Sequence, residues 1–80
     1  MYRCDEEIVR VMLKELKLRA LRREQFYFVL ARKISLSRSI FDRHLQFLVQ
    51  KKRVAKGPNK NDTYHITERG LKFLEALNDN

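Results

Sequence analysis

The side chains best able to do chemistry in this chain of 80 residues are its basic ones, 18 Lys and Arg against 10 Asp and Glu. Their placement is uneven, because residues 17–60 carry 13 Lys and Arg against only Glu24 and Asp42. The flanking segments, 1–16 and 61–80, each carry more acidic than basic residues. Such a basic stretch attracts polyanions, so nucleic acid is the expected partner. A merely soluble basic surface is the plainer interpretation.

Catalysis and metal binding have little support in the residue types. The chain has 2 glycines and no phosphate-binding glycine loop, and no Ser, His and Asp are placed like a catalytic triad. A single cysteine, Cys4, and two distant histidines, His44 and His65, argue against a structural zinc site. We therefore expect no enzymatic activity, no metal, no cofactor and no small-molecule ligand.

The length and composition predict a single domain over residues 1–80. A hydrophobic content of 44% supplies one small core, and no apolar run is long enough to cross a membrane. Acidic residues at positions 5–7 stand where a signal peptide needs basic and apolar ones. The lone Cys4 excludes an intramolecular disulfide and favours a reducing compartment. We expect a cytoplasmic, nucleoid-associated protein.

Apolar periodicity predicts two helices in the first part of the chain. The first runs from about residue 5 to residue 18, with Asp5 as its N-cap. Residues 18–22 form a connector, and a second helix begins near Arg23. Its apolar stripe, which should face a core, comprises Tyr27, Leu30, Ala31 and Ile34.

A third helix is predicted from Arg38 to about Lys51, with Ser37 as its N-cap. Its apolar stripe comprises Phe41, Leu45, Leu48 and Val49. The polar residues that point elsewhere are Arg38, Ser39, Arg43, Gln46 and Gln50. The start of this helix suits a phosphate, because a hydroxyl and free backbone amides lie there.

A β-hairpin and a last helix complete the prediction. Residues 53–56 form a short strand, residues 57–62 concentrate turn-forming residues, and residues 63–66 form the return strand. Thr67 then caps a final helix. Three helices, a hairpin and a C-terminal helix make an α+β fold that is mostly α.

Two segments resemble the winged helix-turn-helix transcription regulators. Residues 34–48 (ISLSRSIFDRHLQFL) resemble their turn and recognition helix, and residues 64–74 (YHITERGLKFL) resemble the junction between wing and last helix. The resemblance covers residues 5–77. It is greatest to the minimal single-domain proteins of archaea and their viruses, and more distant to the MarR and ArsR groups. Two usual glycines are replaced by Ser35 and Lys52, and the second replacement implies a wider or left-handed corner before the wing.

The resemblance implies that helix 38–51 enters the major groove of double-stranded DNA, while a wing at residues 56–62 contacts the adjacent backbone or minor groove. Arg43 is expected to read a base, since arginine to guanine is the commonest specific contact. The residues expected at the DNA are Ser37, Arg38, Ser39, Arg43 and His44 of the recognition helix and its cap, Lys56, Asn59 and Lys60 of the wing, and Arg22 and Arg23 of the second helix.

Some of these residues have plainer alternatives. His44 serves equally as a partly exposed structural residue. Asp42 pairs with Arg38 or with neighbouring lysines, rather than reading cytosine. Ile40 touches a thymine methyl group if it is exposed and belongs to the core if it is not.

The leading interpretation is a sequence-specific transcription regulator that binds a pseudo-palindromic site as a homodimer. By the resemblance, the end helices supply the dimer contacts, and residues that serve equally as interface or core are Leu13, Leu71, Phe73, Leu74 and Leu77. The first alternative is a non-specific nucleic-acid or chromatin-like binder. The second is a domain that docks a protein through Phe26, Phe28 and Val29. A basic face does not distinguish DNA from RNA.

Overall fold

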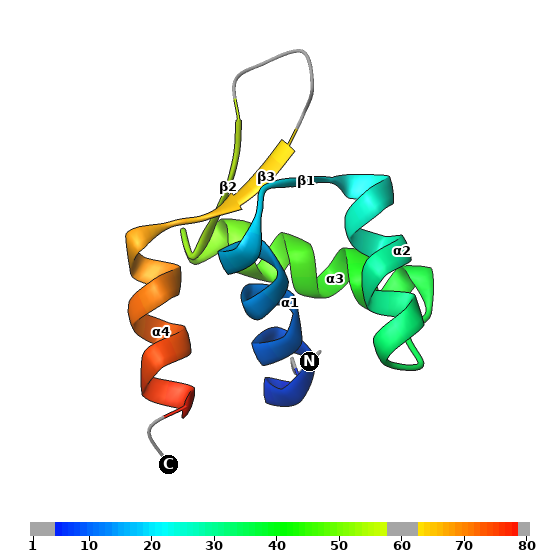
Figure 1. Ribbon diagram of the computed structural model, residues 1–80, viewed down its shortest axis with the longest axis horizontal. Helices are drawn as coiled ribbons and strands as arrows, with labels where there is room; N and C mark the ends of the chain where they lie inside the picture. Colours follow the sequence, from blue (N-terminus) through cyan, green and yellow to red (C-terminus); the bar gives the residue numbers. More distant parts are fainter. Residues whose placement is uncertain (1–4, 58–62, 79–80) are drawn as a thin grey trace.

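The computed structural model describes residues 5–57 and 63–78. In chain order its elements are α1 (Glu6–Leu18), β1 (Leu21–Arg22), α2 (Arg23–Lys33), α3 (Arg38–Gln50), β2 (Val54–Lys56), β3 (Thr63–Ile66) and α4 (Glu68–Asn78). Helices α1 and α4 pack side by side, α3 crosses behind α1, and strands β2 and β3 lie at the end of α1 away from its first turn (Figure 1). This arrangement confirms the predicted α+β, mostly α fold.

The helices begin where the capping residues predict. The Asp5 carboxylate accepts a hydrogen bond of 2.9 Å from the Glu7 amide, and Ser37 Oγ accepts one of 3.3 Å from the Ile40 amide. Each cap satisfies an amide that has no partner within its own helix. The second cap fixes where α3, the predicted recognition helix, starts.

The sheet has one strand more than the sequence predicts. Its order is β1-β3-β2, with both pairs antiparallel, and Leu21 lies opposite Tyr64. Strand β1 spans only Leu21–Arg22, which is too short for an alternating pattern to reveal it. Pairing of β1 with β3 joins the start of α2 to the first residues of β3, Thr63 and Tyr64.

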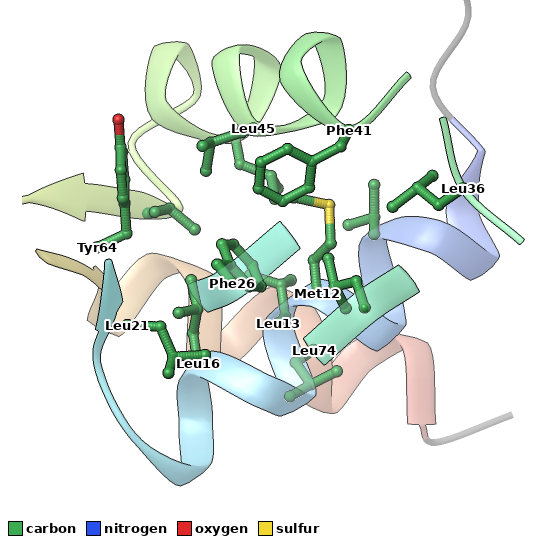
Figure 2. Close-up of a cluster of buried hydrophobic side chains, with 14 residues drawn as sticks. Met12, Leu13, Leu16, Leu21, Phe26, Leu36, Phe41, Leu45, Tyr64 and Leu74 are labelled. Atoms are coloured by element: carbon green, nitrogen blue, oxygen red, sulfur yellow. The ribbon is translucent and has the colours of Figure 1, made fainter. Parts of the chain in front are cut away.

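The core lies where α1, α2 and α3 meet. Phe26 and Phe41 are fully buried, and their rings pack edge to face with centroids 5.3 Å apart. Figure 2 shows Phe41 and Leu45 extending from α3 toward Phe26 and Met12. The predicted stripe of α2 is partly wrong, because Phe26 and Leu30 form its buried centre while Tyr27 is half-buried and Ala31 is exposed.

The corner between α3 and β2 is left-handed, which is one of the two geometries that the sequence leaves open. Lys52 has φ of 61°. Its amide donates to the Val49 carbonyl, and the Arg53 amide donates to the Leu48 carbonyl, both at 3.0 Å. These two bonds form a Schellman motif, in which glycine is the usual residue at the left-handed position. The motif turns the chain sharply from α3 into the wing.

A second contact ties this corner to the start of α4. Thr67 Oγ1 donates to the Lys52 carbonyl at 2.6 Å and accepts from the Gly70 amide at 3.0 Å. Gly70 lies against the Arg53 carbonyl, so closely that a Cβ added there would sit 2.1 Å from that oxygen. Thr67 and Gly70 thus set the position of the hairpin relative to α3.

Candidate nucleic-acid interface

The outward face of α3 is polar along its whole length. Ser39, Arg43, Gln46 and Gln50 are exposed and follow one another at a spacing of three or four residues. They lie opposite the side on which Phe41, Leu45 and Leu48 are buried. We call these four residues the α3 face. A helix with such a face has the width and the donors needed to read base edges in a major groove.

A hollow of about 370 Å³ continues the α3 face toward the wing. Gln46 and Gln50 line it from α3, Arg23 from the start of α2, and Lys56 from β2. Strand β1 sets Arg23 beside the sheet, and the corner at Lys52 sets β2 beside α3. Side chains from three separate parts of the chain therefore converge at one end of the α3 face.

Glu24 and Asp42, the two acidic residues within the basic stretch 17–60, each contact an arginine between the first turns of α2 and α3. Arg38 Nη1 donates to Glu24 Oε2 at 3.1 Å, and Arg23 Nη2 donates to Asp42 Oδ1 at 2.9 Å. Arg38 Nε also lies 3.7 Å from Asp42 Oδ1. The structure therefore shows Asp42 as an ion-pair partner of both arginines, which is one of the two roles the sequence leaves open.

These contacts shift the protonation equilibria in the expected directions. The hydrogen bond from Arg38 lowers the pKa of Glu24, and the same bond raises the pKa of Arg38. The hydrogen bond to Asp42 raises the pKa of Arg23. All three groups are therefore charged at neutral pH.

Arg38 is held by a third neighbour as well. Its guanidinium carbon lies 5.0 Å from the centre of the Tyr27 ring, a cation–π contact. The Tyr27 hydroxyl donates to the Leu36 carbonyl at 3.2 Å, in the turn between α2 and α3. Arg38 therefore connects α3 to α2 through contacts within the protein itself.

A sequence profile described as winged helix-turn-helix matches residues 3–80. The chain belongs to the winged helix-turn-helix family. No curated protein and no solved structure matches the chain. Winged helix-turn-helix domains typically bind DNA through the second helix of the pair, which here is α3, and are not typically enzymes. Among the described residues, no helix is long and apolar enough to cross a membrane.

His44 lies in the core of the winged helix-turn-helix domain and not on the α3 face. Its side chain is 1% exposed. Nε2 accepts a hydrogen bond of 2.9 Å from the Asp5 amide, so the ring proton lies on Nδ1, which donates to the Ile40 carbonyl at 2.8 Å. The expected DNA contact at His44 is therefore corrected, because residue 44 shares the buried side of α3 with Phe41 and Leu48.

The other predicted contacts of the winged helix-turn-helix domain lie on its surface where the structure describes them. The exposed residues among them are Arg22, Arg23, Ser37, Arg38, Ser39, Arg43 and Lys56. Asn59 and Lys60 lie outside the described residues. The Ser37 hydroxyl caps α3, and the Arg22 amide donates to Gln25 Oε1 at 3.4 Å.

Gln46 and Gln50 complete the interface, although the sequence did not single them out as contacts. The signal was available in their spacing, since Gln46 follows Ser39 by seven residues and Gln50 follows Arg43 by seven. The sequence motif that carries the resemblance lies mainly in the turn and the first turns of the recognition helix. It does not show that strand β2 packs beside α3 and extends the surface at Gln50.

Proposed function

We propose that residues 1–80 act as one winged helix-turn-helix domain that binds double-stranded DNA sequence-specifically and regulates transcription. Helix α3 enters the major groove, and the wing at residues 56–62 contacts the adjacent backbone or minor groove. The α3 face carries this proposal, because it combines an arginine with two glutamines on one exposed side of a helix. An intracellular, nucleoid-associated location belongs to the same proposal.

The side chains of the α3 face are proposed to contact different bases. Arg43 is proposed to donate two hydrogen bonds to guanine, which is the commonest specific pairing. Gln46 and Gln50 are suited to adenine, because a carboxamide both donates and accepts as the adenine edge requires. The Ser39 hydroxyl is suited to donate a hydrogen bond to a base or to accept one from it.

The basic residues around the α3 face are proposed to hold the DNA backbone. Arg22 and Arg23 lie at the start of α2, Arg38 and the Ser37 cap at the start of α3, and Lys56 on β2. These positions flank the recognition helix at both ends. Contacts to phosphate at both ends fix the register of the helix in the groove without reading sequence themselves.

A homodimer on a pseudo-palindromic site is the second part of the proposal. Its interface cannot use Leu13, Leu74 or Leu77 as the sequence suggested, because all three are buried within one chain. Leu71 and Phe73 on α4 are only partly buried, so they are the remaining candidates. The test is sizing of the protein with and without duplex. A dimer requires two half-sites about one helical turn of DNA apart.

Selection from a randomised duplex library at fixed salt tests the proposal. We expect a defined motif, and Arg43→Ala should lose discrimination at one base pair by about 1–3 kcal/mol. Arg69→Ala is the matched control, since Arg69 is exposed on α4 and far in the chain from α3. The wild-type affinity should fall with salt with a log–log slope near −0.9 per phosphate contacted.

The alternatives are outcomes of the same experiment. A selection that returns no motif, with affinity still steeply dependent on salt, identifies a non-specific nucleic-acid binder. Tighter binding to duplex RNA than to duplex DNA of the same sequence identifies an RNA-binding domain. Failure to bind any duplex at low salt contradicts DNA binding altogether.

A further inference from the structure

The outer side of α2 exposes apolar residues that the core does not use. Phe28 is 71% exposed, and Val29 is partly exposed. The sequence suggested protein docking through these two residues together with Phe26, but Phe26 is fully buried and is excluded from any docking surface. Helix α2 therefore has a second apolar side, where Phe28 and Val29 lie next to each other, and a contiguous exposed apolar patch is typical of an interaction site.

A hollow of about 610 Å³ lies on this side of α2, between the helix and the extended segment that precedes it. Ala20 and Leu21 line the hollow from the segment, and Phe28 and Val29 line it from the helix. We call it the α2 hollow. Its volume and apolar lining suit the insertion of a large aliphatic or aromatic side chain.

The charged residues that line the α2 hollow are both basic. Arg19 contributes from the segment and Arg32 from the helix, and no acidic residue lines the hollow in the part of the chain that the structure describes. Both arginines are exposed. The complementary partner therefore carries acidic side chains next to its apolar anchor.

The α2 hollow does not compete with the α3 face for space. The helix period places Val29 and Arg32 on the side of α2 opposite Tyr27, and Tyr27 packs against Phe41 of α3 with ring centres 5.4 Å apart. The hollow shares no lining residue with the hollow beside Gln46 and Gln50. Both surfaces are available at the same time.

We propose that the α2 hollow binds an acidic segment of another protein with a large apolar anchor residue, while α3 remains free to hold DNA. A second copy of this chain fits less well. A two-fold contact through this surface would bring Arg19 and Arg32 of both copies together, with no acidic residue in the described lining to offset them. A single strand of nucleic acid would use only Phe28 as a stacking platform and leave Val29 uncovered.

The test is selection, from a library of short random peptides, of those that bind the full chain. Enriched peptides should carry an aromatic or large aliphatic residue flanked by Asp or Glu. Binding of a selected peptide should weaken at least about tenfold in Phe28→Ala, and also in Arg32→Glu, because a central anchor and a complementary charge are both lost. Phe28 is largely exposed, so its truncation should leave the fold intact.

Two controls separate this surface from the DNA-binding one. Arg69→Ala on α4 should leave peptide affinity unchanged, and Phe28→Ala should leave duplex affinity unchanged. The selection is done without DNA, so its outcome is independent of whether the proposed DNA binding holds.

Three results would overturn the proposal. The first is enrichment of peptides without acidic residues, and the second is peptide affinity that Phe28→Ala leaves unaltered. The third is a different occupant: oligothymidylate that binds wild type but not Phe28→Ala identifies a nucleic-acid site. Self-association that Phe28→Ala abolishes identifies a second copy of the chain in the same place.

Discussion

The guanidinium of Arg38, the first residue of α3, is hydrogen-bonded to the carboxylate of Glu24, the second residue of α2, with Nη1 3.1 Å from Oε2. This pair joins the two helices of the helix-turn-helix unit at the mouth of the proposed DNA site. It also places a negative charge beside a proposed phosphate contact. Any phosphate that binds Arg38 must compete with Glu24.

Removal of the Glu24 charge should tighten DNA binding. In Glu24→Gln the affinity for any duplex should rise at low salt, because the repulsion between the carboxylate and the DNA phosphates is lost. The gain should shrink as salt screens the charges. Fluorescence anisotropy with labelled duplex measures this change. Glu68→Gln on α4 is the matched control and should have no effect, whereas weaker binding in Glu24→Gln would show that Glu24 positions Arg38 for the DNA.

The pKa of Glu24 should report the pair directly. Arg38 lowers the pKa of Glu24 below its ordinary value of 4.5. The ion pair therefore persists at every pH above the lowered pKa and breaks only as the pH falls through it. Carboxyl NMR of the wild type should therefore show a Glu24 midpoint below 4.5. In Arg38→Ala the midpoint should move up toward 4.5. An unchanged midpoint would mean that the pair does not form in solution.

Gln46 should read sequence and not merely add affinity. Gln46→Ala should lose discrimination at one A·T pair by about 1–3 kcal/mol while affinity for unrelated duplex stays the same. Repeating the duplex selection with the variant shows which position relaxes. The opposite pattern, a uniform loss on all sequences with the motif unchanged, would place Gln46 at the backbone.

Lys52 should carry a cost in stability. Its φ of 61° is unfavourable for a residue with a β-carbon, so Lys52→Gly should raise the free energy of unfolding by about 1 kcal/mol. Urea denaturation measures the change. Lys51→Gly is the matched control and should destabilise the protein, since Lys51 has φ of −83° and gains nothing from glycine. A destabilised Lys52→Gly would show that the corner tolerates the lysine without strain.

Gly70 should be needed for the packing of α4 against the corner. A methyl group there would sit 2.1 Å from the Arg53 carbonyl oxygen, so Gly70→Ala should lower the free energy of unfolding by about 2–3 kcal/mol. Glu75→Ala, an exposed position on the same helix, should change stability little. A Gly70→Ala variant as stable as the wild type would mean that α4 moves away from Arg53 at no cost.

Much of the fold could be predicted because local rules and tertiary packing agree. Asp5 and Ser37 cap the helices that they were predicted to cap, and Thr67 hydrogen-bonds the Gly70 amide in the first turn of α4. Lys52, which replaces a usual glycine, adopts the left-handed conformation, one of the two corner geometries left open by the sequence. Strand β1 was missed because its two residues form a strand only through pairing with β3.

The candidate site was harder to predict, since it depends on contacts between residues distant in sequence. His44 fits a family pattern but falls on the buried side of α3, where it bonds the Asp5 amide. The pairing of Asp42 with Arg23 depends on the packing of α2 against α3. The extent of the α3 face toward Gln50 depends on where the corner at Lys52 places the wing.

Chemical-shift mapping of the isotope-labelled protein with a selected duplex shows which face of the domain contacts DNA. We expect the largest amide shifts on Ser39, Arg43, Gln46 and Gln50, with smaller ones at the start of α2 and on β2. The amides of α4 should shift little. Largest shifts on α1 and α4, with the α3 face unchanged, would mean that α3 is not the recognition helix.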